Sequence, residues 1–319
     1  MAEYKTKSPI VVICGPTASG KTKVAIELAK RINGEIVCAD SMQIYDTLKI
    51  GTARPTEAEM QGIAHHLYGF LNPNRQYSVS EYVVDANKII GQIADRGAVP
   101  IVCGGTGLYI RSLVSGVRFT SENTDFSLRA QIQREYEEFG AEKLLAEIAA
   151  SDSECALTLH PNNMKRIVRT LELLRTTGKC VAELHAESKT DISEYPCAMI
   201  VLSSKNREYL YDRIERRVDL MMKENLLNEA RWVYDNRIEC KTAAQAIGYK
   251  EFFGYFEGRD ALQYCVDELK KSTRHYAKRQ ITWFKRDEEA VWADIQTDSV
   301  PAIADAAQNM WNSIRKKQK

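Results

Sequence analysis

Long hydrophobic runs and a large net charge of either sign are both missing from this sequence. Its 319 residues include 44 Lys and Arg against 43 Asp and Glu, so any binding of nucleic acid would depend on local basic patches. No apolar stretch approaches the length that spans a membrane, and the start, MAEYKTKS, has no apolar signal segment. We therefore expect a cytoplasmic protein without a membrane partner.

Cysteine pairs typical of zinc and redox sites are also missing. None of the eight cysteines forms a C-x-x-C pair, and several stand within apolar runs, where cysteine packs as a small core residue. This pattern favours a reduced protein without a structural zinc site. Internal repeats and low-complexity segments are absent as well, and the length suffices for one large core or two modest ones.

What the sequence does contain is an alternation of short apolar runs and helical patterns. Buried strands are predicted at 10–13 (IVVI), 35–40 (EIVCAD), 101–105 (IVCGG) and 198–204 (AMIVLSS). Strands separated by helices pair in parallel, and helices then cover both faces of the sheet. Functional residues are expected at the carboxyl ends of these strands.

A glycine-rich loop follows the first predicted strand. The stretch CGPTASGKT fits G-x-x-x-x-G-K-[ST], the P-loop, whose main-chain N–H groups hold phosphate at a helix N-terminus. Two glycines allow backbone geometry that a Cβ would obstruct, the lysine supplies positive charge, and the threonine offers a hydroxyl to Mg²⁺. A glycine-rich turn that binds nothing is the alternative. The predicted phosphate-binding residues are Gly15, Pro16, Thr17, Ala18, Ser19, Gly20, Lys21 and Thr22.

The pattern of the sequence changes between residues 120 and 195, where mixed charge and helical periodicity leave no strand signal. We predict an α/β fold, a P-loop-containing parallel sheet flanked by helices, interrupted by an all-helical insertion domain. The core domain comprises residues 1–119 and 196–319, and the insertion comprises residues 120–195.

A nucleotide or small-molecule kinase is the usual owner of such a loop. Kinases of this type need a carboxylate after a later apolar strand to hold Mg²⁺. Asp40 ends the second predicted strand, whereas the third ends in glycines and Thr106, with no acid. Residues that would clamp a γ-phosphate or activate a water are not evident, which argues against hydrolysis. The argument is weak, because Asp40 itself could hold the metal.

Nine blocks of sequence, in order, resemble the tRNA dimethylallyltransferase (isopentenyl-tRNA transferase) family, in its bacterial form without a zinc module. The loop alone would be unspecific, but this series covers nearly the whole chain. The blocks are GPTASGKT (15–22), DSMQIY (40–45), IGTARP (50–55), HHLYGF (65–70), GGTGLY (104–109), HPNNMKRIVRTLE (160–172), RIERRVDLM (213–221), AIGYKE (246–251) and TRHYAKRQITWFKR (273–286).

The resemblance implies that the P-loop holds the diphosphate of dimethylallyl diphosphate and that no phosphoryl group is transferred. The prenyl carbon moves to N6 of the adenosine at position 37 of tRNA, immediately 3′ of the anticodon, and diphosphate leaves. Lys21, the loop amides and Mg²⁺ on Thr22 would stabilise the charge that develops on the leaving oxygens. Asp40 is a further candidate ligand of the Mg²⁺ cofactor.

Two arginines four residues apart share one face of a predicted helix. By resemblance, Arg217 is a catalytic clamp on the diphosphate and Arg213 binds the same group. The alternative is that both arginines pair with Glu215 or nearby acids on a solvated face.

Adenine N6 is a poor nucleophile, because its lone pair is delocalised into the ring. By resemblance, Asp40 accepts its proton, a contribution typically worth ~10²–10⁴ in rate; metal ligation or helix N-capping are the alternatives. Ser41, Met42 and Gln43 would border the adenine, and Thr106 would contact the same nucleotide. The base would have to be extruded from its stack to enter this site.

Two basic segments are candidates for contact with tRNA. Residues 270–286 carry seven Lys or Arg and no acid, and at helical spacing they lie opposite an apolar side that includes Tyr276 and Trp283. Gln280 falls within that apolar side, so it needs a specific hydrogen-bond partner. We predict that Arg279 and Gln280 contact tRNA; an ordinary amphipathic surface helix is the alternative.

The second basic segment lies in the predicted insertion, diluted by Glu172. Such an insertion would read loop shape and splayed bases rather than duplex sequence. By resemblance, the residues that contact the anticodon stem-loop are Arg129, Lys165, Arg166 and Arg169.

The sequence departs from the family pattern at Asn163 and Asn225, where the family often has Asp and Gly. Asn163 can still cap a helix, and Asn225 tolerates a left-handed backbone. His65 and His66 lack a carboxylate or cysteine cluster at ligand spacing, so we predict that they are structural.

Three alternatives to prenyl transfer onto tRNA stay open from sequence. They are a P-loop kinase, an RNA-binding protein with a vestigial loop, and an adenylate isopentenyltransferase that accepts free AMP or ADP. The basic insertion argues against the last. A monomer is expected.

Overall fold

The computed structural model describes residues 8–116, 126–179, 183–184 and 195–317, and within these ranges the chain divides into two compact units. We call them the core unit, Met1–Ser115 with Ser193–Lys319, and the inserted unit, Gly116–Ile192. The predicted insertion was 120–195, and its start at residue 120 lies outside the described residues.

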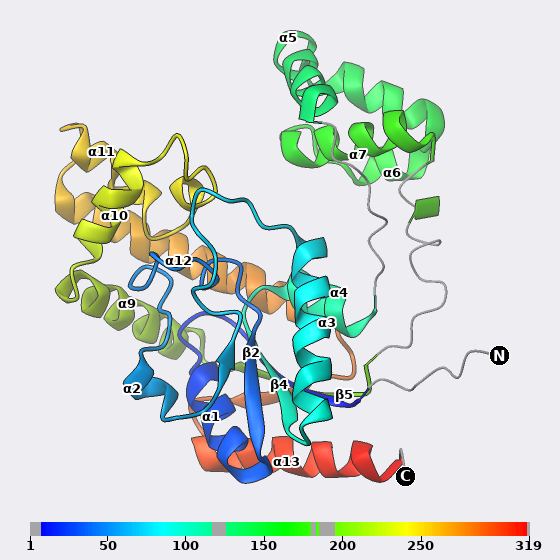
Figure 1. The fold of residues 1–319 in the computed structure, drawn as a ribbon. Coiled ribbons are helices and arrows are strands. Elements are labelled where there is room, and N and C mark those ends of the chain that lie inside the picture. Colours follow the sequence, from blue (N-terminus) through cyan, green and yellow to red (C-terminus); the bar gives the residue numbers. More distant parts are fainter. Residues whose placement is uncertain (1–7, 117–125, 180–182, 185–194, 318–319) are drawn as a thin grey trace. The chain divides into compact units, whose positions relative to one another are not determined.

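The core unit is built on one parallel sheet of six strands, in the order β3-β2-β4-β1-β5-β6 (Figure 1). β1 lies near its centre, with Val11 opposite Ile101 on β4 and Ala198 on β5. This confirms the predicted α/β fold and places the ends of β1, β2 and β4 along one edge. The strands are β1 Ile10–Cys14, β2 Gly34–Cys38, β3 His65–His66, β4 Val99–Gly104, β5 Cys197–Ser203 and β6 Val291–Asp294.

Helices cover the sheet and extend beyond one edge of it. Those that reach the candidate site are α1, α4, α9 and α12. The described helices of the core unit are α1 Lys21–Ile32, α2 Glu57–Met60, α3 Val79–Asp95, α4 Gly107–Val114, α9 Arg207–Lys223, α10 Leu226–Asp235, η1 Ala243–Gln245, η2 Lys250–Phe252, α11 Phe253–Phe256, α12 Leu262–Phe284 and α13 Val300–Lys317.

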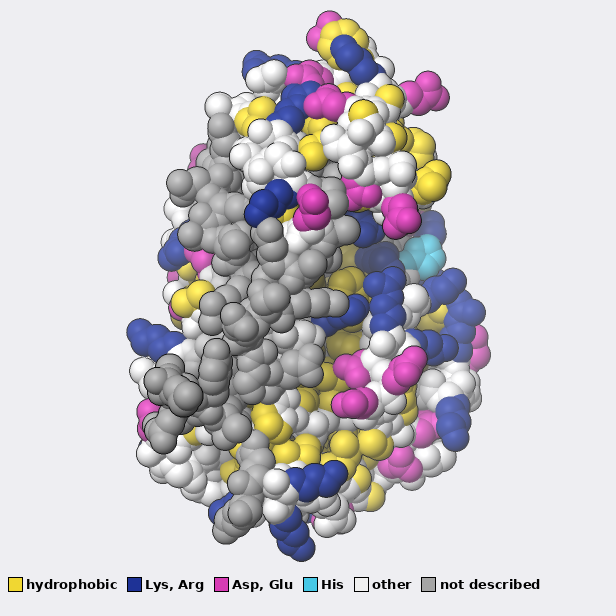
Figure 2. All heavy atoms as spheres, turned by 90° about the vertical axis from the view of Figure 1, so that its right-hand side faces the viewer, with side chains coloured by type: hydrophobic (Ala, Val, Ile, Leu, Met, Phe, Trp, Pro, Cys, Tyr) yellow, Lys and Arg dark blue, Asp and Glu magenta, His cyan; other side chains and the backbone are white. Residues whose placement is uncertain are grey.

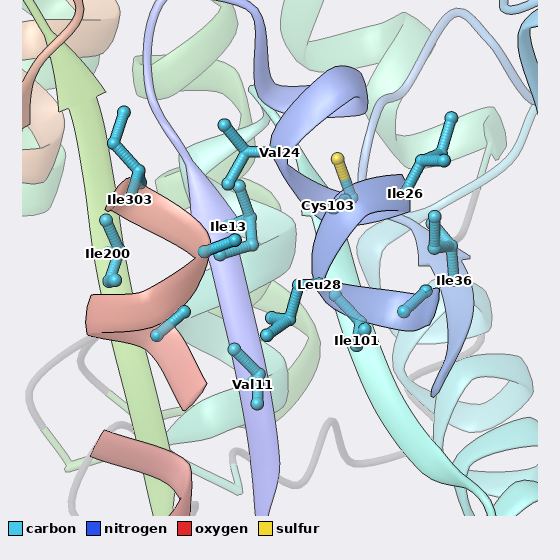
Figure 3. Packing of buried hydrophobic residues seen from close by; sticks show 14 of the residues in the cluster. Val11, Ile13, Val24, Ile26, Leu28, Ile36, Ile101, Cys103, Ile200 and Ile303 are labelled. Atoms are coloured by element: carbon cyan, nitrogen blue, oxygen red, sulfur yellow. The ribbon is translucent and has the colours of Figure 1, made fainter. Parts of the chain in front are cut away.

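The main core packs α1 and α13 against one face of the sheet (Figure 3). Val11 and Ile13 of β1 meet Val24 and Leu28 of α1, and Ile303 of α13 lies on the same side. The four residues from β1 and α1 are 0–1% exposed, so this face excludes water. Burial of each large aliphatic side chain contributes roughly 1.5–3 kcal/mol. The P-loop therefore starts from a rigid strand.

The inserted unit has its own small core of helices. α5 (Phe126–Ser151), α6 (Ser153–Thr158) and α7 (Met164–Thr177) bury Ile132, Leu144, Ile167 and Leu171 between them. Gly140 has φ +79° and breaks α5 into two helical segments. A residue with a Cβ would be strained there.

The two asparagines that depart from the family pattern behave as predicted. Asn163 is the N-cap of α7, and its side chain accepts a hydrogen bond from the Arg166 N–H. Asn225 has φ +70° where the chain turns from α9 into α10.

No helix in the described parts of the chain is long and apolar enough to cross a membrane.

Candidate active site

The P-loop lies between β1 and α1, and its two glycines are needed for different reasons. A Cβ on Gly15 would lie 2.2 Å from the Leu202 carbonyl oxygen on β5, so the loop passes too close to the sheet for any other residue. Gly20 has φ +88° directly before α1 begins at Lys21, and no side chain caps this helix. The first N–H groups of α1 are thus left for a ligand or water.

Lys21 is held in the loop by a neutral partner. Its Nζ donates to the Pro16 carbonyl at 2.7 Å. The pKa of Lys21 is lowered to about 8, mainly by burial and also by the charge of nearby Arg217, while Cys103 and Asp40 act in the opposite direction. Within the described residues, the hydroxyl of Ser19 is buried without a hydrogen-bond partner. An anion in the loop would give Lys21 a counter-ion and the Ser19 hydroxyl a hydrogen-bond acceptor.

The two predicted arginines of α9 also reach the loop. Arg213 Nε donates to the Ala18 carbonyl at 2.8 Å, and Arg217 Nη1 lies 3.4 Å from Thr17 Oγ1. Burial lowers the pKa of Arg217, and the charge of Arg213 lowers it further. The predicted shared face is confirmed.

The alternative role for these arginines, pairing with Glu215, is wrong. Glu215 pairs instead with Arg274 of α12, with 2.6 Å between Glu215 Oε1 and Arg274 Nη1. Helical spacing had placed Arg274 among the solvent-facing cations of residues 270–286, but in the structure it is paired with an acid. Lys21, Arg213 and Arg217 together place three cations on one short loop.

Asp40 follows β2, and one of its carboxylate oxygens closes the turn after the strand. Oδ1 accepts hydrogen bonds from the N–H groups of Met42 at 2.9 Å and Gln43 at 3.3 Å. The described hydrogen bonds of this carboxylate all use Oδ1, which leaves Oδ2 for another partner. Thr106, the first residue before α4, accepts from the Ser41 N–H at 3.0 Å. The ends of β2 and β4 are thereby tied together.

A second acid, which the sequence did not single out, holds the loop that follows this turn from α10. The carboxylate of Glu229 accepts from the N–H groups of Lys49, Ile50 and Gly51 at 2.8–3.1 Å. The next two carbonyls of the same loop, those of Thr52 and Ala53, accept hydrogen bonds from the side-chain amide of Gln43. On a helical pattern alone, an acid at this position looks like an ordinary solvated residue.

Gln280 of α12 has the specific partners that its position demanded. The side chain is 5% exposed; Oε1 accepts from the Thr17 N–H at 2.8 Å and Nε2 donates to the Gly105 carbonyl at 2.9 Å. Both polar atoms of the amide thus have partners within the chain. The predicted contact of Gln280 with tRNA is not tested by this geometry and stays a prediction. Trp283 packs on Gly107, where a Cβ would lie 2.1 Å from the indole.

The outer face of α12 keeps a basic surface. Figure 2 shows Lys and Arg side chains close together on one face of the molecule, with hydrophobic side chains between them. The exposed cations from the middle of α12 to just after its end are Lys271, Lys278, Arg279, Lys285 and Arg286.

In the inserted unit, two of the predicted tRNA contacts share a buried acid. Glu172 is 1% exposed, and its Oε2 lies 2.7 Å from Arg129 Nη2 and 3.0 Å from Arg169 Nη1. Lys165 and Arg166 are exposed in the first turn of α7. The sequence interpretation treated Glu172 as a dilution of charge, whereas the structure makes it the centre of this cluster.

The adjacent histidines make contacts within the chain. His66 Nε2 lies 2.7 Å from a Glu35 oxygen, and His65 Nδ1 lies 2.8 Å from the Ile63 carbonyl. Burial lowers the pKa of His65.

A parallel sheet whose first strand leads through a cation-lined glycine loop into a helix defines a P-loop α/β protein. Comparison with known proteins narrows this class. A family model described as IPP transferase matches residues 43–287, and the chain belongs to this family.

Relatives with similar sequences have one name in common. The tRNA dimethylallyltransferase of Bacillus subtilis (strain 168) is 44% identical over 290 residues, which cover 91% of this chain and 92% of the relative. That of Bacillus licheniformis is 44% identical over 291 residues, covering the same shares of each chain.

Solved structures agree with the sequence comparison. The tRNA isopentenylpyrophosphate transferase of Bacillus halodurans has a TM-score of 0.73 at 36% identity, covering 98% of this chain and 99% of that one. A eukaryotic dimethylallyltransferase described as acting on tRNA has a TM-score of 0.78 at 28% identity, covering 90% of this chain and 74% of that one.

Proposed function

We propose that this protein transfers the dimethylallyl group from dimethylallyl diphosphate to N6 of the adenosine immediately 3′ of the anticodon in tRNA. The observation that carries the proposal is the convergence of Lys21, Arg213 and Arg217 on the P-loop, at the same edge of the sheet where Asp40 follows β2. Family membership supports the same reaction.

The P-loop binds the diphosphate as a leaving group. When the bond between the allylic carbon and oxygen breaks, negative charge grows on the diphosphate and the carbon acquires cationic character. Preorganised N–H groups and cations stabilise this charge most where it appears. Lys21 and Arg217, whose pKa values are lowered in the free protein, gain a counter-ion when diphosphate binds.

Thr22 is the residue that would hold Mg²⁺. Its hydroxyl, completed by diphosphate oxygens and water, forms a donor set that suits this ion, while Oδ2 of Asp40, which the turn does not use, stays available to accept a proton. When bound, Mg²⁺ would neutralise part of the charge on the diphosphate.

Asp40 also serves as the base for the nucleophile. The new bond joins the allylic carbon to N6, the old carbon–oxygen bond breaks, and the proton lost from N6 goes to the carboxylate. The Oδ1 bonds to the turn fix the orientation of the group. Ser41 and Thr106, joined across the two strand ends, border the inserted purine.

The basic surfaces would receive the tRNA. The exposed cations of α12 contact phosphates without reading sequence. Arg129, Lys165, Arg166 and Arg169 of the inserted unit contact the anticodon stem-loop. A kinase is the second candidate, and it is disfavoured because it gives no role to these surfaces.

The test uses the protein with Mg²⁺, dimethylallyl diphosphate and unmodified tRNA that has an adenosine 3′ of the anticodon. Mass spectrometry of the digested nucleosides should find dimethylallyl adenosine. Parallel reactions replace the tRNA with AMP, or replace the donor with ATP. Product from AMP alone, or phosphate transfer from ATP without prenyl transfer, would overturn the proposal.

A further inference from the structure

α12 supplies the only described side chain that joins the P-loop to the end of β4. Gln280 lies deep in the protein, with one amide atom on the Thr17 N–H and the other on the Gly105 carbonyl. Thr17 belongs to the loop that follows β1, and Gly105 directly follows β4. One planar amide therefore spans the two strand ends between which the substrates must meet.

The amide lies close against the backbone at the end of β4. A Cβ on Gly105 would lie 2.3 Å from Gln280 Nε2, so the backbone there has to be glycine for the amide to approach. The next contact along α12 is equally close, with Trp283 against Gly107. The helix is thus fitted directly onto the segment that carries Thr106.

Tyr276, one helical turn before Gln280 on the same face of α12, lies on the side of the site that carries Asp40. Tyr276 lies close enough to Asp40 to respond to its charge: the pKa of Tyr276 is raised by burial and then by the charge of Asp40. Residues 276 and 280 are four apart and lie on one side of the helix. This inner face borders both halves of the site, while the outer face carries the exposed cations.

The contact with Thr17 has a consequence for the P-loop. Its N–H is committed to Gln280, so this N–H is not available to an anion in the loop and the peptide plane is fixed. The Thr17 hydroxyl is left beside Arg217 Nη1 at 3.4 Å. The orientation of the loop and the position of the arginine are therefore linked through one residue.

We propose that Gln280 is a positioning residue, which holds the diphosphate loop and the end of β4 in the relative placement that prenyl transfer requires. The inference rests on the proposed function. A neutral hydrogen bond contributes only about 1 kcal/mol to stability, whereas a displacement of about 1 Å in a reacting group can cost ~10² in rate. Removal of the amide should therefore reduce turnover much more than folding.

The test compares Gln280→Met, which keeps the length of the side chain, with Gln263→Met, an exposed glutamine on the same helix that bonds to Asp267. Gln280→Met should lower kcat ~10–100-fold and weaken binding of inorganic pyrophosphate, measured by calorimetry without RNA, while the KM for tRNA changes less than about twofold. Gln263→Met should match the parent in all three measurements.

Two results would overturn the inference. One is unchanged kcat and pyrophosphate affinity in Gln280→Met. The other is a raised KM for tRNA with unchanged kcat, which would make Gln280 an RNA contact. If Gln280→Met does not fold, Gln280→Glu replaces it: it retains the acceptor for Thr17 but loses the donor to Gly105, and it should show the same loss of kcat. Absence of prenyl transfer by the parent protein would defeat the proposed function, and the pyrophosphate measurement would still decide the role of Gln280.

Discussion

Arginines are used in opposite ways in the two units of this protein. In the core unit, Arg213 and Arg217 contact a carbonyl and a hydroxyl of the P-loop, and no described acid pairs with them. In the inserted unit, Arg129 and Arg169 converge on the buried carboxylate of Glu172.

This difference in pairing indicates that the two arginine clusters suit different ligands. Cations that lack a counter-ion gain most when an anion arrives, which suits a site for a diphosphate leaving group. Cations already held by a buried acid gain less charge neutralisation, but their guanidinium groups are fixed in direction. That arrangement suits recognition of a shaped surface such as an anticodon loop.

The largest effect is expected next to the core cluster, at Asp40. Asp40→Asn keeps an oxygen that can accept the turn hydrogen bonds but removes the base, so kcat should fall ~10²–10⁴-fold with little change in melting temperature. Single-turnover kinetics with saturating tRNA measures the loss. Asp46→Asn, an exposed acid in the same segment, is the control. A change of less than about tenfold in Asp40→Asn would remove Asp40 from the chemistry.

Loss of one cation from the core cluster comes second. Arg217→Ala should lower kcat about 10²-fold, because a stabiliser of charge on the leaving group is missing. Arg216→Ala tests specificity, since Arg216 is adjacent, exposed and paired with Asp212. Equal effects of the two substitutions would contradict the assignment of Arg217.

The inserted cluster should respond differently. Glu172→Gln leaves Arg129 and Arg169 with a neutral partner, so we expect the unit to lose roughly 1–3 kcal/mol of stability and tRNA affinity to fall about tenfold at physiological salt. Binding of pyrophosphate should be unchanged, with Glu138→Gln as an exposed control. If pyrophosphate binding falls as much as tRNA binding, the two clusters do not have separate tasks.

The smallest effect is the pH dependence of the core cluster. In the free protein the pKa of Lys21 is about 8, so its charge is lost as the pH rises through this value. The kcat/KM for dimethylallyl diphosphate should therefore fall above about pH 8. The profile of Lys21→Arg should stay flat there, because arginine keeps its charge. An identical decline in both proteins would assign the titration to another group.

The same shift has a consequence for stability, with the opposite sign from a paired lysine. The folded-state pKa, about 8, lies below the unfolded value of 10.5, so the folded state binds fewer protons between these values. The cost of burying the charge is fully present below pH 8 and is relieved as the pH rises toward 10.5. Lys21→Met should accordingly raise the melting temperature of the free protein while it weakens pyrophosphate binding.

Local patterns were enough to predict the parts of the fold that are buried and continuous in sequence. The central strands and the P-loop were found because apolar runs and a glycine motif are local signals. β3 and β6 were missed, since they are short, half-exposed edge strands that depend on pairing with the sheet. α9, the helix that carries Arg213 and Arg217, begins at Arg207 because Asn206 caps it.

The candidate site was predictable only in its local pieces. P-loop residues are contiguous, and the family resemblance supplied Asp40. The acids Glu172 and Glu229 act on partners far along the chain, and Gln280 meets Thr17 across 263 positions. No periodicity encodes such pairings. The sequence could predict that Gln280 needs a partner, but not which one.

The central claim is that the P-loop retains a departing diphosphate and passes no phosphoryl group on. The direct measurement is the stoichiometry of inorganic pyrophosphate released to dimethylallyl adenosine formed, in one reaction with tRNA, dimethylallyl diphosphate and ATP together. The account predicts equal amounts of the two products and intact ATP. Consumption of ATP with phosphorylated product, or prenylated adenosine without matching pyrophosphate, would contradict it.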